Sequence, residues 1–193
     1  ALDLQLLNHV LYINKLSGSQ GAAGLFSATG SATIGGPMDV HFSASQLNFG
    51  LFTGLAGLKL QDVTGTADIE ANIGGYTYNP SADITLQAVN GGFQGAAFDT
   101  LTGGAHLKNG QINLTELKVA KQVGERNCSA TVKGIVPLRA LTAGKDEWLD
   151  DYEQIQLQVS LQNADLSLLP TLSKQIDWAL GPTEGEVKIY GSL

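Results

Sequence analysis

The stretch QIQLQVSLQ at residues 154–162 decides the fold of this chain. Every second residue from Ile155 to Leu161 is aliphatic, and the residues between are glutamine or serine. Such a period of two predicts an antiparallel strand with one buried and one solvated face. The same alternation recurs in DIEANI at 68–73, and around Leu2, Leu4 and Leu6, Met38, Val40 and Phe42, Ile84, Leu86 and Ala88, and Val187 and Ile189.

Turn signals and one helical pattern lie between these strands. The turn signals are Asn90-Gly91-Gly92, Gly103-Gly104, Asn109-Gly110 and Gly35-Gly36-Pro37. Leu169, Leu172, Ile176 and Leu180 recur at helical spacing and predict a short helix near 167–180, while the glycines of segment 50–60 weaken a second candidate. The expected fold is therefore all-β, with long antiparallel strands and one or two short helices.

Composition narrows the classes of function. The 193 residues are 43% hydrophobic and only 15% charged, with a net charge of −7. An acidic chain is a poor ligand for phosphates, so nucleic acid is not an expected partner. The single cysteine, Cys128, excludes an internal disulfide framework, and we expect it to be a small buried hydrophobe. No apolar run reaches the roughly 18 residues of a transmembrane helix, and no signal-peptide pattern is present.

The chain matches itself in four places. LYINKL at 11–16 matches INLTEL at 112–117 (offset 101), and FSAT at 26–29 matches CSAT at 128–131 (offset 102). FSASQLNFGLF at 42–52 matches VSLQNADLSLL at 159–169 (offset 117), and GTADI at 65–69 matches GEVKI at 185–189 (offset 120). Because such units stack on copies of themselves, we expect a fragment of a longer repeat protein.

The repeat predicts how the chain is organised. Residues 1–62 are expected to end one β-groove repeat with a short capping segment. Residues 63–193 are expected to form the following repeat, with an acidic insertion at 141–153 and the helix near 167–180. Both belong to one continuous structural unit.

The polar residues do not form a pattern expected of a catalytic or metal site. His9, His41 and His106 have no cysteine or carboxylate at metal-ligand spacing except Asp39, two residues before His41 and so on the same strand face. The acidic cluster Asp146, Glu147, Asp150, Asp151 and Glu153 lacks the spacing and turn glycine of a calcium loop. No G-x-S-x-G elbow is present. We expect no enzyme activity, no metal and no cofactor.

Three segments resemble the TamB family, relatives of AsmA in the bacterial translocation and assembly module. They are FDTLTGGAHLKNGQINLTEL at 98–117, LQNADLSLLPTL at 161–172 and VTGTADIEANIGGYTYNP at 63–80. Segments 137–153 and 50–60 depart from the family pattern. The resemblance implies a curled, groove-like sheet (a β-taco) in the periplasm, within a parent protein anchored in the inner membrane. It also implies phospholipid transport between the membranes and support of outer-membrane protein assembly.

These expectations define a candidate site and its partners. The groove residues expected to face lipid are Ile69, Ala71, Ile73, Ile84, Leu86, Ala88, Ile112, Leu114, Leu117, Val119, Ala130, Val132, Ile155, Leu157, Val159 and Leu161. The implied partners are phospholipid acyl chains, adjacent repeats of the same chain and an outer-membrane barrel assembly protein. A strand of eight or nine residues is about 30 Å long, enough to lie along an acyl chain. The alternative is a structural or adhesive β-repeat domain whose apolar faces close on each other as a core.

Overall fold

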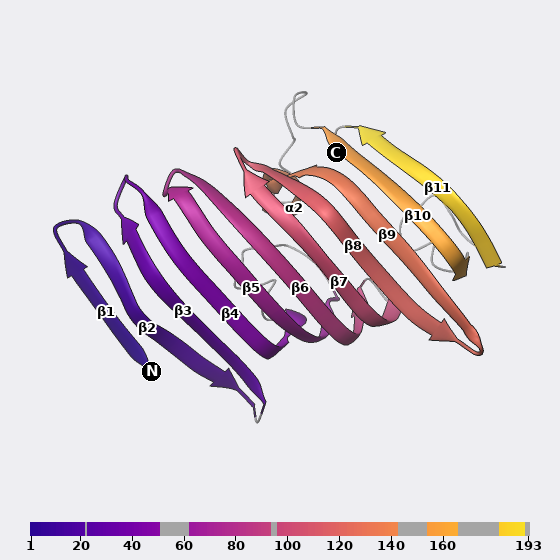
Figure 1. The fold of residues 1–193 in the computed structure, drawn as a ribbon, viewed down its shortest axis with the longest axis horizontal. Coiled ribbons are helices and arrows are strands. Elements are labelled where there is room, and N and C mark those ends of the chain that lie inside the picture. The colour runs from indigo at the N-terminus through magenta and orange to yellow at the C-terminus, as the bar shows by residue number, and fades with distance from the viewer. Residues whose placement is uncertain (22, 51–61, 94–95, 143–153, 166–181, 192–193) are drawn as a thin grey trace.

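The computed structural model describes residues 1–21, 23–50, 62–93, 96–142, 154–165 and 182–191. These residues form one antiparallel sheet of eleven strands, whose order in space follows the chain (Figure 1). The strands are β1 (Leu2–Leu7), β2 (Val10–Gln20), β3 (Gly24–Thr33), β4 (Met38–Asn48), β5 (Thr64–Tyr76), β6 (Asn79–Phe93), β7 (Ala96–Lys108), β8 (Gln111–Val123), β9 (Arg126–Pro137), β10 (Ile155–Asp165) and β11 (Pro182–Gly191). A short helix, α2 (Leu138–Thr142), follows β9. The prediction of an all-β fold with long antiparallel strands is confirmed.

Tight turns produce this meander, since antiparallel strands can be joined by two residues. Asn109-Gly110 has positive φ at both positions, 51° and 71°, as a two-residue type I′ hairpin turn requires. Asn8-His9 joins β1 to β2 in the same way, with φ of 49° and 66°. The turn predicted at Asn109-Gly110 is therefore confirmed.

Two other predicted turns are wrong. Asn90-Gly91-Gly92 lies inside β6, and Gly103-Gly104 lies inside β7. Their glycines make room for large neighbours: a Cβ on Gly91 would lie 2.3 Å from the Phe98 ring, and one on Gly103 would lie 2.7 Å from a methyl of Leu117. A glycine within a strand thus marks a close approach between neighbouring strands.

β-Bulges correct the strand period where two apolar residues are three apart. Ala44 and Leu47 of β4 pair with Ile69 and Ala67, so Ser45 and Gln46 oppose a single residue of β5. The same irregularity occurs between Leu114 and Leu117 of β8. Because each bulge adds one residue, both apolar positions stay on one face, and the strand twists and bends locally.

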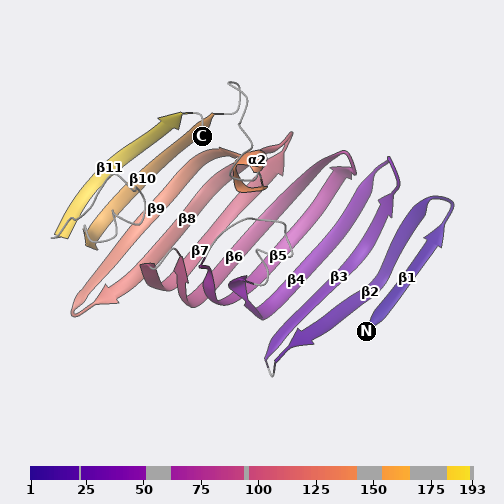
Figure 2. The same cartoon turned by 180° about the vertical axis from the view of Figure 1, so that it is seen from behind.

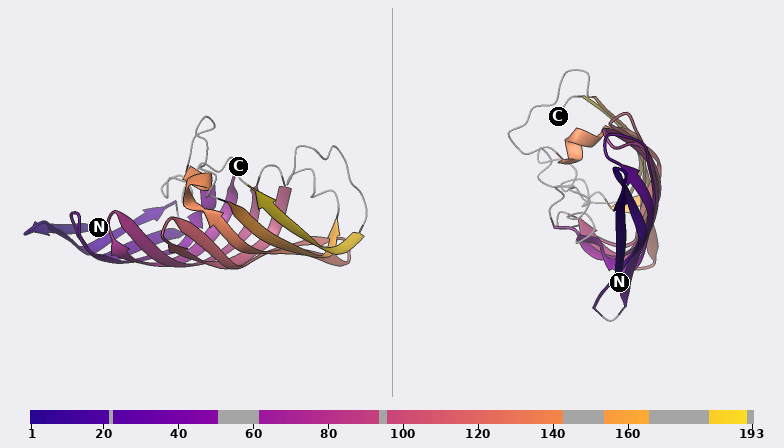
Figure 3. Two further views of the ribbon diagram at one scale, coloured as in Figure 1. Left: turned by 90° about the horizontal axis from the view of Figure 1, so that it is seen from above. Right: turned by 90° about the vertical axis from the view of Figure 1, so that its left-hand side faces the viewer.

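The sheet is curled and groove-like. Figure 2 shows it from behind, and Figure 3 shows it edge-on as a curved layer with α2 on its inner side. β1 and β11 are the two edges of the sheet. Among the described residues, no helix is long and apolar enough to cross a membrane.

The strand pairing agrees with the internal repeat in two of its four segments. The bulge at Ser45-Gln46 recurs 117 residues later at Gln162-Asn163, where the φ of Gln46 (49°) is matched by that of Asn163 (47°). The bulge after Ile13 in β2 recurs 101 residues later, after Leu114 in β8.

For the other two sequence matches, the offset between equivalent residues in the strand pairing differs from the offset in the sequence by an even number of residues. Gly30 in β3 corresponds by register to Gly134 in β9, an offset of 104 where the sequence match gives 102. Ala71 in β5 corresponds to Val187 in β11, an offset of 116 where the match gives 120. An even displacement keeps each residue on the same face of the sheet.

Part of the prediction falls outside the described residues. This applies to the helix near 167–180, to segment 51–60 and to residues 143–153 of the expected acidic insertion, with its acidic cluster. The first residues of that insertion, 141–142, end α2.

Candidate functional site: an apolar sheet face

One face of the sheet carries continuous rows of apolar residues across the strands. The central row has one residue from each of the eleven strands: Leu2, Leu16, Ala28, Phe42, Ala71, Ile84, Ala105, Leu114, Gly134, Leu157 and Ile189. Adjacent members are direct cross-strand partners, so their side chains are neighbours on one face, with a gap only at Gly134. Ten strand spacings of about 4.8 Å give the row a length of about 48 Å.

Three further rows run parallel to the central row. One runs from β2 to β11: Gly18, Phe26, Ala44, Ile69, Leu86, Gly103, Leu117, Val132, Val159 and Val187. The second runs from β1 to β9: Leu4, Ile13, Gly30, Val40, Ile73, Ala82, Leu107, Ile112 and Val136. The third runs from β4 to β11: Leu47, Ala67, Ala88, Leu101, Val119, Ala130, Leu161 and Gly185. We call the surface made by these four rows the apolar face; none of its members is polar or charged.

The pairing brings all sixteen predicted groove residues onto this face. Fifteen belong to the four rows, and Ile155 lies two residues before Leu157 on β10, on the same side of the strand. The sequence reasoning missed members of β1 to β4 and of β7, including Phe26, Ala44 and Leu101. The alternation at Leu2, Leu4 and Leu6 was a signal for β1, but the bulges and the glycines of β7 concealed much of the rest.

The apolar face is packed in the middle of the sheet and open toward its edges. Ala44, Leu47, Ala67, Ile69, Ala88 and Phe98, on β4 to β7, form one buried cluster, against which Phe49 packs. At the edges, Leu2 of β1 is 67% exposed and Ile189 of β11 is 43% exposed. The eleven described strands form one sheet, so they do not close on each other as a two-sheet sandwich.

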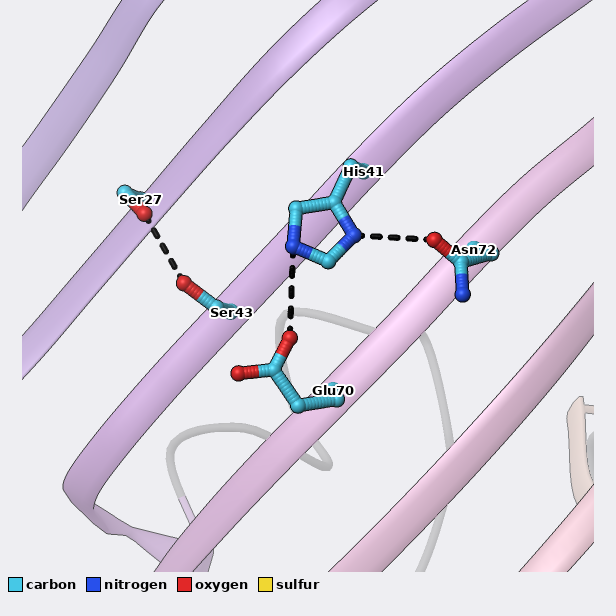
Figure 4. Close-up of polar contacts among 5 residues, drawn as sticks. All are labelled: Ser27, His41, Ser43, Glu70 and Asn72. Carbon is cyan, nitrogen blue, oxygen red and sulfur yellow. Dashed lines mark hydrogen bonds and ion pairs between the residues drawn. The ribbon is translucent and has the colours of Figure 1, made fainter.

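The opposite face is polar and is held together by cross-strand hydrogen bonds. Figure 4 shows Ser27 bonded to Ser43 at 2.9 Å, and His41 between Asn72 (Nδ1 to Oδ1, 2.9 Å) and Glu70 (Nε2 to Oε2, 3.3 Å). His41 and Glu70 are both about half exposed, so their interaction adds little to stability. These residues mark the solvated face of the sheet.

The polar residues singled out in the sequence lie apart from the apolar face. Asp39 and His41 are both exposed on β4, and His106 of β7 contacts Asp83 of β6. Within the described part of the chain, no group of three or more His, Cys, Asp or Glu residues is placed to hold a metal ion. Cys128 is 3% exposed, which confirms its prediction as a buried residue.

Carboxylates on the polar face accept hydrogen bonds from backbone N–H groups of neighbouring strands. The Gln46 backbone N–H donates to Asp68 Oδ1 at 2.7 Å, which satisfies a bulged residue of β4. Near the end of β8, the Gln122 N–H donates to Asp99 Oδ2 at 2.6 Å. Side chains of the solvated face thus help to fix the register on which the apolar rows depend.

A comparison of the chain with protein-family models, with curated proteins and with solved structures finds no match. The four rows of the apolar face present aliphatic and aromatic side chains, whose chemistry suits contact with hydrocarbon.

Proposed function

We propose that this chain is a segment of a TamB-like cell-envelope protein whose apolar sheet face carries phospholipid acyl chains between the inner and outer membranes. The observation that supports it is the central row, which runs without a polar residue from one edge of the sheet to the other. A path with both ends at a sheet edge suits transfer along the protein better than capture in a closed pocket.

The energetics favour hydrocarbon as the occupant. Each acyl CH₂ that leaves water for an apolar surface contributes about 0.8 kcal/mol. Aliphatic side chains of similar chemistry follow one another along the row, so no single position holds the chain much more tightly than the next. Such a surface allows sliding, because leaving one position and entering another changes the free energy little.

Composition and the family resemblance support the finer parts of the proposal. An acidic, charge-poor chain is a poor match for anionic headgroups, so recognition rests on acyl chains. By its resemblance to the TamB family, we place the parent protein in the periplasm, anchored in the inner membrane. There it supports outer-membrane protein assembly with an outer-membrane barrel protein and with adjacent repeats of its own chain.

Photo-crosslinking tests this function. A photoreactive residue is placed at Leu157 or at Leu86, on the apolar face, in the full chain expressed in the periplasm of a two-membrane bacterium. The matched control is Gln158, the next residue on β10, which is exposed on the polar face. We expect phospholipid adducts from the two leucine positions and none from Gln158.

Two outcomes contradict the proposal. Equal lipid labelling from Gln158 and Leu157 means that lipid adsorbs to the protein without using the apolar face. Protein adducts from Leu157, with no lipid, favour the alternative of a structural or adhesive β-repeat with protein partners.

A further inference from the structure

The apolar face is not equally accessible along its length. On β8, the members of all four rows are partly exposed: Ile112, Leu114, Leu117 and Val119. On β5, Ile73 alone among the members of the four rows is partly exposed. The other three are buried: Ala67 and Ile69 at 1% exposure and Ala71 at 5%. A face that is four rows wide on β8 therefore narrows to one row on β5.

Aromatic packing closes the missing rows. The buried cluster takes up the rows of Ala67 and Ile69 on β4 and β5, and Phe26, Phe42 and Phe49 pack against it. The Phe26 ring lies over Gly18, its partner on β2, where an added Cβ would be 2.5 Å from the ring. A side chain with 1% exposure is almost out of reach of water, so it has no room for a larger acyl CH₂.

On its other side, Ile73 lies close to the end of the strand. Its cross-strand partners are Val40 of β4 and Ala82 of β6. Gly75, two residues further along β5, has no side chain, and the strand ends at Tyr76. An acyl chain that crosses β5 on the apolar face is therefore confined to the Ile73 side chain, between the buried cluster and the turn that joins β5 to β6.

The spacing of the rows limits the width of what can cross. Neighbouring rows are two residues apart along a strand, which is about 6.8 Å. Carbon atoms in contact are about 3.5–4.0 Å apart, so a single row accommodates one extended hydrocarbon chain. A rigid system of fused rings is wider than one chain and cannot narrow itself by rotation about single bonds.

We propose that Ile73 is the selecting residue of the apolar face, where unbranched acyl chains cross β5 one at a time and rigid fused-ring lipids are excluded. The assignment rests on the function proposed above, since it takes hydrocarbon as the occupant of the face. It adds the place at which the path is narrowest and the class of lipid that can pass there.

Labelling with a photoreactive lipid tests where the path runs. The probe is a phospholipid with a diazirine in one acyl chain, and its adducts with the full chain are mapped by mass spectrometry after photolysis. We expect adducts at Ile73 and at Leu117. Ile69 is the matched control, because it lies on the same face of the same strand as Ile73 but is 1% exposed, and it should carry none.

Competition with unlabelled lipids tests the selection in the unmodified chain. Excess palmitate, which is a single unbranched chain, should reduce labelling at Ile73 and at Leu117 alike. Excess cholesterol should reduce labelling at Leu117, where four rows are accessible, and should leave labelling at Ile73 unchanged.

A larger side chain at the narrow point tests the role of Ile73 itself. Ile73→Trp should lower the labelling of Val40 by about tenfold, because loss of the contacts of about two CH₂ groups weakens binding by that factor. Leu117→Trp makes a similar enlargement where the face is wide and should leave Val40 labelling unchanged. Circular dichroism verifies that both variants are folded.

Three results would overturn the assignment of Ile73. Adducts at Ile69 as abundant as those at Ile73 mean that the buried cluster opens to lipid. Equal competition by cholesterol at Ile73 and Leu117 means that β5 does not select by width, and equal loss of Val40 labelling in the two folded Trp variants means that Ile73 has no special place. If neither Ile73 nor Leu117 is labelled, the acyl-chain function itself is refuted, and the selection with it.

Discussion

An aspartate placed at two positions of the apolar face separates its packed part from its open part. Ile69 is 1% exposed within the buried cluster of β4 to β7, whereas Leu157 of β10 is only partly buried. Both are members of apolar rows, so a difference between them reflects what covers each position and not the strand pattern.

The magnitudes follow from burial. Truncation of a buried Ile to Ala costs about 2–5 kcal/mol, and Ile69→Asp adds a carboxylate without a partner of opposite charge. A total above about 5 kcal/mol is comparable to the whole stability of a domain, so Ile69→Asp should unfold the chain. Leu157→Asp loses only part of the 1.5–3 kcal/mol that full burial of Leu contributes, about 1 kcal/mol, and its carboxylate reaches water. For a chain of this length, that lowers the melting temperature by about 2–4 °C.

The assay combines thermal unfolding with lipid retention. Each variant is melted by circular dichroism, and the phospholipid that copurifies with the folded protein is extracted and quantified. We expect Leu157→Asp to remain folded and to retain much less phospholipid than wild type. Gln158→Asp, which adds the same charge on the opposite face, should match wild type in both measurements.

Two results would refute this reasoning. If Leu157→Asp unfolds as completely as Ile69→Asp, position 157 belongs to a closed core and the face is not open there. If Leu157→Asp is folded and retains as much lipid as wild type, the central row is not the surface that holds it.

Two further changes test the backbone features that shape the sheet. Gly134→Ala should lower the free energy of unfolding in urea by more than about 2 kcal/mol, because φ is 135° and the new Cβ would lie 2.0 Å from the Gln156 carbonyl oxygen. The control Gly185→Ala should be nearly neutral, because its Cβ would have nothing within 4 Å. Equal losses of stability in the two variants would contradict this explanation. Asp68→Ala should cost about 1 kcal/mol in the same assay, because it removes the acceptor of the Gln46 N–H at the β4 bulge, while Asp39→Ala, on the exposed side of the same sheet region, should cost less. A loss no larger for Asp68→Ala than for Asp39→Ala would show that the bulge does not depend on that bond.

The sequence is enough to predict the strands and one face of the sheet, but not their full extent. Period two identified β10 and the centre of β5, because their apolar residues alternate without interruption. Strict alternation is interrupted between Ala44 and Leu47, which were missed, and between Leu114 and Leu117, which were both predicted on the apolar face; in each place a bulge adds a residue. The pairing partner supplies the geometry of a bulge, and a local pattern does not contain it.

Glycine was the second source of error. Gly103-Gly104 carries the same signal in a turn and in the middle of β7, since both uses depend on the missing Cβ. Only the partner strand distinguishes them, here through Leu117 against Gly103. The order of the strands follows from tight turns such as Asn109-Gly110, which leave a meander as the simplest path.

The placement of the bulges links the repeat to the apolar face. A strand of thirteen residues with strict alternation would keep its apolar residues on one face but would stay comparatively straight. Bulges in four strands, after Ile13 in β2, at Ser45-Gln46 in β4, after Leu114 in β8 and at Gln162-Asn163 in β10, bend the sheet at recurring places while returning the next aliphatic residue to the same face. Curvature and a continuous apolar surface therefore have the same cause. A strand that kept the extra residue but paired without the bulge would turn every following residue to the other face, whereas deletion of the extra residue would keep the faces and remove the local bend.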